Sequence, residues 1–223
     1  MASEVIEMNC PNCGVSIKVS VEEFIDVKEN EEYKQRFIDG DFFLHTCGEC
    51  GAGFILEYPV MYMDPDRKLN IYMVPDHEDD ILEQLNSLEL PENATDPDAC
   101  FRLTSNCMDL MEKIHIFEHG RDDRVMELYK FIIWDQVKEE WPDLEQGDLM
   151  YVYDEGTDYF VILPSENEKD EKLMIPIEKD LYKDLFDNYM HALEIPPGHY
   201  TEVNQESAPP IFKTADTIQP QRC

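Results

Sequence analysis

The chain has 223 residues, with 50 acidic and 18 basic side chains and a formal net charge of −32. Hydrophobic residues make up 43%, an ordinary share that indicates a folded protein rather than a disordered one. Because the acidic residues are spread along the whole chain, its surface should repel phosphate backbones and anionic lipid, which argues against nucleic-acid and membrane binding.

The first 75 residues predict strands arranged around two cysteine pairs. Residues 15–21 are apolar at every second position and follow a weaker alternation at 4–8, so a hairpin is expected there. A helix is expected at 31–38, ending before Gly40. Further strands are expected at 42–45, 54–63 (interrupted by Pro59) and 69–73.

Residues 76–142 have mainly helical character. A helix follows the acidic run 76–80, a loop is expected at 89–98, and a short strand at 101–103. Two helices then follow, the first capped by Ser105 or Asn106 and the second by Asp122 or Asp123. Their short connection at Gly120 predicts a helical hairpin, which Pro142 closes.

The remainder predicts a small sheet, a helix and an irregular tail. Strands are expected at 149–153, 159–163 and 173–177, with an acidic loop at 166–171. A helix is expected at 178–193, and prolines preclude regular structure over much of 196–223. The fold class is therefore α+β. We expect a region at 1–142 (zinc-binding sheet to about 75, helices at 76–142), then the sheet and helix at 143–195.

The strongest chemical signal is a pair of CxxCG motifs. Cys10 and Cys13 lie in one, Cys47 and Cys50 in the other, and each motif stands between predicted strands. Two thiolates separated by two residues on a tight turn can face one ion, and the following glycine permits a positive φ. The motifs predict a structural zinc ribbon with four thiolate ligands and no open coordination position. The 33 residues between the motifs exceed the usual 15–20, which the intervening strand and helix explain.

Two other interpretations of the cysteine pairs are a redox CxxC and unmetallated thiols. A redox CxxC normally opens a helix in a thioredoxin-like unit, and no such pattern surrounds either pair. The sequence shows no export signal, which would consist of a basic segment followed by an apolar stretch. No apolar run approaches the roughly 20 residues that span a bilayer. We therefore expect a cytoplasmic protein, in which paired cysteines are metal ligands before they are disulfides.

Beyond the cysteine motifs, several stretches resemble the CpXC family of bacterial and archaeal proteins. They are residues 10–14, 39–51, 58–64, 69–75 and 112–127, and the resemblance spans about residues 8–134. The chain departs from the family name at Gly48, where proline is usual, but metal ligation does not need that proline. The resemblance supports a metal site and the extent of the fold, and it implies no particular activity.

Several weaker signals have ordinary structural interpretations. His115 and His119 have the i, i+4 spacing of two ligands on one helix face, and with Asp122 and Asp123 they would form the site of a metal-dependent enzyme. The structural alternative places His119 at a helix end and Asp122 or Asp123 at a helix start.

Other residues are candidates of the same weak kind. Arg121 and Arg124 either form a functional loop or lie in a structural segment with a C-cap glycine, an Asp N-cap and helical pairs such as Arg124 with Glu127. His45 could replace or supplement a cysteine ligand, but a histidine on the strand surface is favoured, because four thiolates already fill the shell. Cys100 and Cys107 are expected to be buried thiols; Cys223 has no assigned role.

These signals favour a non-catalytic zinc-binding protein that acts through protein–protein interaction, and a basic protein is the kind of partner that the acidic surface favours. A narrower alternative is an acidic inhibitor, or an immunity-type protein, for a basic nucleic-acid-binding partner. The metal-dependent enzyme that uses His115 and His119 with Asp122 and Asp123 is a second alternative. Nucleic acid itself ranks last as a partner, since the sequence has no basic stripe.

Overall fold

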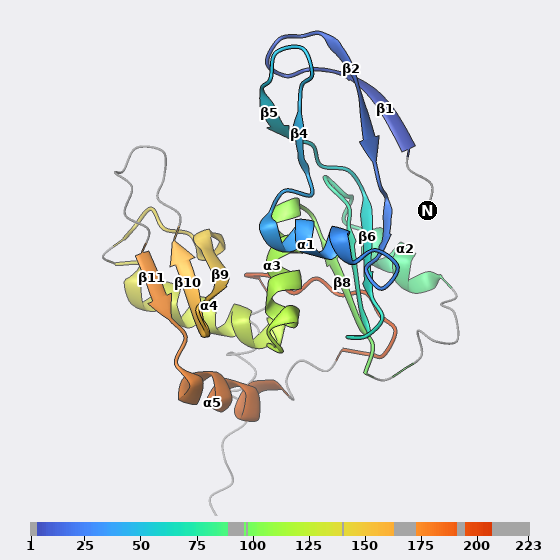
Figure 1. Ribbon diagram of the computed structural model, residues 1–223. Coiled ribbons are helices and arrows are strands. Elements are labelled where there is room, and N and C mark those ends of the chain that lie inside the picture. Colours follow the sequence, from blue (N-terminus) through green and yellow to red (C-terminus); the bar gives the residue numbers. More distant parts are fainter. Residues whose placement is uncertain are drawn as a thin grey trace, which may run out of the picture. The chain divides into compact units, whose positions relative to one another are not determined.

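The computed structural model describes residues 4–88, 96, 98–139, 141–162, 173–190 and 195–206 (Figure 1). Contacts group the chain into two compact units. Unit 1 comprises Met1–Met111 with Pro196–Thr201, and unit 2 comprises Glu112–Ile195 with Glu202–Cys223. The domain boundaries near residues 142 and 195 stay a prediction. The acidic loop at 166–171, most of the loop at 89–98 and the tail beyond residue 206 lie outside the described residues.

Two small antiparallel hairpins carry the cysteine motifs in unit 1. Strand β1 (Glu4–Asn9) pairs with β2 (Ser16–Val21), with Asn9 opposite Ser16 at the end of the ladder. Strand β4 (Leu44–Thr46) pairs with β5 (Gly53–Ile55), with Thr46 opposite Gly53. The four cysteines of the two hairpin ends lie together, which confirms the zinc-ribbon-like α+β fold.

A four-stranded mixed sheet forms the rest of the β-structure in unit 1. Its order is β3 (Phe24–Asp26), β6 (Val60–Asp64), β7 (Leu69–Met73) and β8 (Cys100–Thr104). The central pair β6–β7 is antiparallel, and both outer pairs are parallel. The expected strand at 54–63 is divided into β5 and β6 around Pro59, because proline cannot donate to a strand ladder.

Helix α1 (Glu31–Asp39) packs an aromatic cluster in unit 1. Gly40 ends the helix with φ of 77°, the left-handed conformation that glycine adopts without strain. Phe37 is fully buried and stacks on Phe42 with ring centroids 4.0 Å apart, while Tyr62 of β6 meets Phe37 edge-on at 5.2 Å. Helix α2 (Ile81–Ser87) is shorter and has no buried residue.

The chain crosses from unit 1 to unit 2 within α3 (Cys107–Glu118). Both predicted helix starts are confirmed: the Asn106 carboxamide accepts from the Asp109 amide at 2.8 Å, and the Asp122 carboxylate accepts from the Arg124 amide at 3.0 Å. Helix α4 (Asp123–Val137) follows.

Unit 2 is completed by a three-stranded antiparallel sheet and a final helix. The sheet order is β11 (Leu173–Pro176), β10 (Thr157–Ile162) and β9 (Leu149–Asp154), which confirms the predicted hairpin and third strand. Helix α5 (Lys179–Tyr189) follows the sheet.

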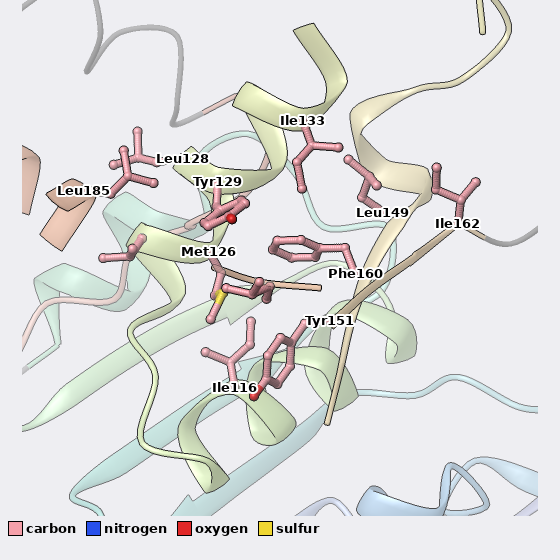
Figure 2. Packing of buried hydrophobic residues seen from close by; sticks show 12 residues of the cluster. Ile116, Met126, Leu128, Tyr129, Ile133, Leu149, Tyr151, Phe160, Ile162 and Leu185 are labelled. Atoms are coloured by element: carbon pink, nitrogen blue, oxygen red, sulfur yellow. The ribbon is translucent and has the colours of Figure 1, made fainter. Parts of the chain in front are cut away.

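One face of the sheet packs on α4, as Figure 2 shows for the buried residues Tyr129, Ile133 and Phe160. The rings of Tyr129 and Phe160 have centroids 5.6 Å apart. Leu185 of α5 joins the same buried cluster. In the described part of the chain, no helix is long and apolar enough to span a membrane.

The described part of the tail is irregular, as expected, but some of its side chains are buried. Tyr200 is buried and its ring meets Phe101 of β8 at 5.2 Å, within unit 1. Val203 is buried in unit 2, where its carbonyl accepts from the Lys113 ammonium at 2.5 Å. Residues 195–206 therefore contribute packing to both units without forming a helix or a strand.

Candidate metal centre

Each CxxCG motif forms the same tight turn at the end of its hairpin. In the first, the Cys10 amide donates to the Val15 carbonyl and the Gly14 amide to the Cys10 carbonyl, both at 2.9 Å. The second repeats this pattern from Cys47, again with both bonds at 2.9 Å. Gly14 and Gly51 have φ of 73° and 71°, a conformation that other residues adopt only with strain. The two turns therefore present their thiols in equivalent ways.

The four cysteine sulfurs are spaced as a tetrahedral metal site requires. The Cys10 and Cys50 sulfurs are 3.9 Å apart, as are those of Cys13 and Cys47, and all four lie within 4.8 Å of one another. A zinc–sulfur bond of about 2.3 Å gives tetrahedral sulfur separations of about 3.8 Å. A disulfide would need a separation of about 2.05 Å. The geometry thus fits four ligands around one ion.

Main-chain amides favour the thiolate form at this cluster. The Ala52 amide, followed by the Asn12 carboxamide 3.6 Å away, lowers the pKa of Cys50 to about 6. The Cys13 amide likewise lowers the pKa of Cys10. The Val15 amide favours the Cys13 thiolate, but contact with the Cys10 thiol raises the pKa of Cys13 to about 12. A nearby cation would favour the anion at every position.

The arrangement can hold an ion but offers that ion no open position. Cys10 and Cys47 are buried, whereas Cys13 and Cys50 face solvent. Four thiolates complete a tetrahedral shell, so a substrate has no place to coordinate. Because each hairpin supplies two ligands, an ion here would fasten the hairpins together. The cluster can therefore hold a metal, and its closed shell suits a structural role.

His45 lies outside the ligand cluster. It belongs to β4 and its ring meets Phe54 of β5 at a centroid distance of 6.0 Å. Its Nε2 is shielded from solvent without a hydrogen-bond partner, and burial lowers the pKa of His45. Among the described residues, the only group of three or more potential ligands within bonding range of one ion is the four cysteines.

The residues of the enzyme alternative do not converge on an ion. The His119 ring lies 3.9 Å from that of Tyr153, and its Nδ1 is 2.8 Å from the His115 carbonyl. Asp122 caps α4 and pairs with Arg124 at 2.6 Å. Asp123 is buried and pairs with Lys113 at 3.1 Å. Helix capping and ion pairing therefore occupy both carboxylates.

Other charged residues of this region also have structural roles. Arg121 pairs with Asp158, and its guanidinium lies 5.1 Å from the Tyr182 ring centre.

The two cysteines of this region outside the motifs differ in burial. Cys107 is buried, as expected, and Cys100 is half-buried. The Cys107 amide opens α3 and donates to the Glu57 carboxylate at 2.6 Å. Burial and then Glu57 raise the pKa of the Cys107 thiol to about 12.

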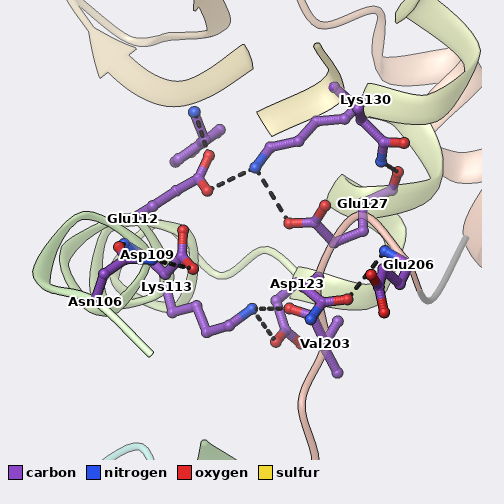
Figure 3. Close-up of polar contacts among 12 residues, drawn as sticks. Asn106, Asp109, Glu112, Lys113, Asp123, Glu127, Lys130, Val203 and Glu206 are labelled. Atoms are coloured by element: carbon purple, nitrogen blue, oxygen red, sulfur yellow. Dashed lines mark hydrogen bonds and ion pairs between the residues drawn. The ribbon is translucent and has the colours of Figure 1, made fainter. Parts of the chain in front are cut away.

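Sequence reasoning missed a buried ionic cluster in unit 2 (Figure 3). The Lys130 ammonium pairs with Glu112 at 2.6 Å and Glu127 at 3.1 Å, and all three side chains are almost completely buried. The second carboxylate oxygen of Glu112 accepts from the Tyr151 amide of β9 at 2.5 Å. The i, i+3 spacing of Glu127 and Lys130 on α4 could have predicted their pairing from the sequence. Glu112 could not be predicted in this way, because it belongs to another helix, α3.

Comparison with known proteins identifies a family for this chain. A family model described as CpXC protein matches residues 8–130, more than half of the chain. No curated protein and no solved structure matches the chain. The matched stretch contains both cysteine turns, the mixed sheet of unit 1, α3 and the first half of α4.

Proposed function

The chain belongs to the CpXC protein family, and from this premise we propose that it is a non-catalytic zinc-binding protein that acts by binding another protein. The observation that carries the proposal is the closed set of four cysteine sulfurs, all within 4.8 Å of one another. In this proposal Cys10, Cys13, Cys47 and Cys50 hold one zinc ion. The ion stabilises the two hairpins and takes part in no reaction.

Zinc is the metal that this donor set favours. Four thiolates in tetrahedral geometry suit zinc or iron, and hairpin-borne CxxC turns are typical of structural zinc sites. Calcium and magnesium prefer oxygen ligands, which the cluster lacks. Elemental analysis of natively purified protein should find one zinc per chain, whereas one iron per chain would contradict the zinc assignment.

The metal assignment also makes a prediction for single variants. Cys10→Ser should lose the zinc and destabilise unit 1, because metal binding contributes directly to folding. Cys100→Ser is the matched control, since Cys100 lies outside the cluster, and it should keep one zinc. Zinc content and thermal unfolding would be measured for both proteins. Unchanged zinc and melting in Cys10→Ser would contradict the site.

A protein partner with a basic surface is supported by the charge of −32, which steers such a partner and repels nucleic acid. The narrower alternative is an acidic inhibitor, or an immunity-type protein, for a basic nucleic-acid-binding protein. A toxin gene beside this one would favour that alternative. The enzyme alternative has less support, because its carboxylates are engaged in capping and ion pairs.

Partner binding is tested by retention at two salt concentrations. Zinc-loaded protein, immobilised and exposed to nuclease-treated native lysate, should retain a specific basic protein at low salt and release it at high salt. The nuclease treatment removes nucleic-acid bridges between an acidic and a basic protein. If nothing specific is retained even at low salt, the proposed interaction function is wrong.

A further inference from the structure

A groove of about 480 Å³ lies beside the second cysteine turn, entirely within unit 1. One wall is formed by residues 16–20 of β2. The other is formed by His45 and Thr46 of β4, with Gly48 and Glu49 of the turn. The volume falls within the roughly 300–1,000 Å³ typical of ligand-binding clefts.

The groove follows the edge of a strand rather than its face. Successive side chains of a strand point to opposite faces. In β2 the pattern is clear, since Ser16, Lys18 and Ser20 are exposed while Val19 is buried. A cavity lined by all five consecutive residues is therefore explained best by a position along the edge, where main-chain amides and carbonyls point outward. His45 and Thr46, also consecutive, place the edge of β4 on the other wall.

Both of these edges are open in the described part of the chain. Strand β2 pairs only with β1 and β4 only with β5, each in a two-stranded sheet. A strand edge without a neighbour presents a row of main-chain donors and acceptors to an incoming chain. The His45 Nε2, which has no hydrogen-bond partner, belongs to a residue of the same wall.

We propose that this groove binds an extended, basic segment of the partner protein, which adds to β2 as a further β-strand. The inference rests on the proposed function and says where its partner binds. The five-residue wall offers about 16 Å of edge at about 3.3 Å per residue, enough for a short extended segment. Strand addition of this kind draws affinity from main-chain hydrogen bonds.

The charges around the groove favour a basic segment. Glu49 lies on the wall, and a divalent ion in the adjacent cluster would leave two of the four thiolate charges uncompensated. Lys18 is the one lysine or arginine of the lining, and it stands opposite Glu7 in the β1–β2 register. The local field therefore favours lysine and arginine side chains in the bound segment.

Gly48→Trp tests the groove directly. Nothing lies within 4 Å of a Cβ at Gly48, and its φ is not in the left-handed range, so a large side chain can be added there without backbone strain. Glu32→Trp, at an exposed position in the first turn of α1, is the matched control. Zinc content is measured for both variants, so that loss of the metal site is not mistaken for loss of binding.

The ligands for this test are fluorescent peptides selected from a phage-displayed library of random octapeptides on the zinc-loaded full chain. Selected peptides should be basic, and Gly48→Trp should weaken their binding by about tenfold or more while Glu32→Trp leaves it unchanged. N-methylation of alternate peptide amides should abolish binding for one set of positions only, because every second amide of an added strand faces β2.

Two results would overturn the inference: peptides that bind Gly48→Trp as well as wild type, and peptides that tolerate N-methylation at every position. Failure of the proposed function would be recognised separately, in the lysate experiment. If the protein retained from lysate binds wild type and Gly48→Trp equally, the groove is not its site, although the interaction function stands. If wild type retains no protein, the interaction function fails whatever the peptides do.

Discussion

Asp158 shows how a single residue of unit 2 is held by several partners. It accepts from the Tyr151 hydroxyl and the Arg121 guanidinium, both at 2.5 Å. Burial of the carboxylate acts to raise its pKa, but the bonds from Arg121 and Tyr151 outweigh burial and lower the pKa of Asp158. Burial, followed by the hydrogen bond to Asp158, raises the pKa of Tyr151. Asp158 therefore contributes to stability as an anion.

The sign of its pH dependence follows from linkage. A carboxyl whose pKa is lower in the folded state stabilises the fold above its unfolded pKa of about 3.9, and this contribution is lost as the pH falls through the folded pKa. Asp158→Asn should be less stable than wild type at pH 7, and the difference should shrink below about pH 4. Urea unfolding at several pH values measures this difference. A constant difference from pH 7 to pH 2 would contradict the assignment.

Lys130 is a second residue whose surroundings allow its contribution to stability to be predicted. Burial alone would lower its pKa, but Glu112 and Glu127 raise it, so the lysine is a buried cation between two carboxylates. Burial in turn raises the pKa of Glu127. Lys130→Met would leave both acidic groups buried without their cation, and should destabilise unit 2 by about 3–5 kcal/mol.

The matched control for Lys130→Met is Lys183→Met. Lys183 pairs with Asp187 at 3.8 Å on the exposed face of α5. A solvent-exposed pair contributes about 0–1 kcal/mol, so this variant should unfold nearly as wild type does. Chemical unfolding of the two variants under one condition makes the comparison. Equal losses would show that burial does not set the cost at Lys130.

At the scale of elements, the two cysteine hairpins are the segments that an ion at the four cysteines would stabilise directly. Each is a two-stranded ribbon, and an isolated hairpin is marginally stable in water. Unit 2 has a buried cluster of twelve residues built from α3, α4, α5 and the sheet. The two kinds of element should therefore respond differently to removal of the metal.

We predict that a chelator exposes the hairpins and spares unit 2. Amide hydrogen exchange should increase in residues 4–21 and 44–55, because bound metal contributes to the folding of these segments. Peptides from α4 and from β9–β10 should keep their protection. Mass spectrometry of exchanged peptides measures this, and added zinc should restore the original pattern. Uniform exchange in both units would mean that the ion stabilises more than the hairpins.

The pairing of elements also shows which contacts local sequence patterns could not predict. The cysteine turns and both helix caps depend on residues within a few positions of one another, and all were predicted. The parallel pairs β3–β6 and β7–β8 were not, since each joins segments about 30 or more residues apart. The burial of Tyr200 and Val203 was missed for the same reason, because proline content describes local backbone and not distant contacts.

For the molecule as a whole, the charge of −32 has a measurable consequence apart from any partner. Like charges repel one another more in the compact state than in the expanded chain, and salt screens this repulsion with a Debye length of about 10 Å at 0.1 M. The melting temperature at pH 7 should therefore rise between about 20 and 500 mM sodium chloride.

Calorimetry at both salt concentrations measures the effect. Repetition near the isoelectric point, about 4.2, provides the control, because the net charge and its repulsion vanish there. A melting temperature that falls with salt at pH 7 would mean that favourable ion pairs outweigh the net repulsion.

The sequence by itself determined the parts that local physical chemistry controls. Period-two and helical patterns predicted most elements, glycine after each cysteine pair predicted the turns, and the shared CxxCG spacing predicted the four-sulfur cluster. Only the tertiary structure decided how distant segments meet: the parallel strand pairs, the Glu112–Lys130–Glu127 cluster, and the open edges of β2 and β4 along one groove. The reason is range, since backbone preferences act over a few residues whereas these contacts join segments whose spacing in sequence carries no signal.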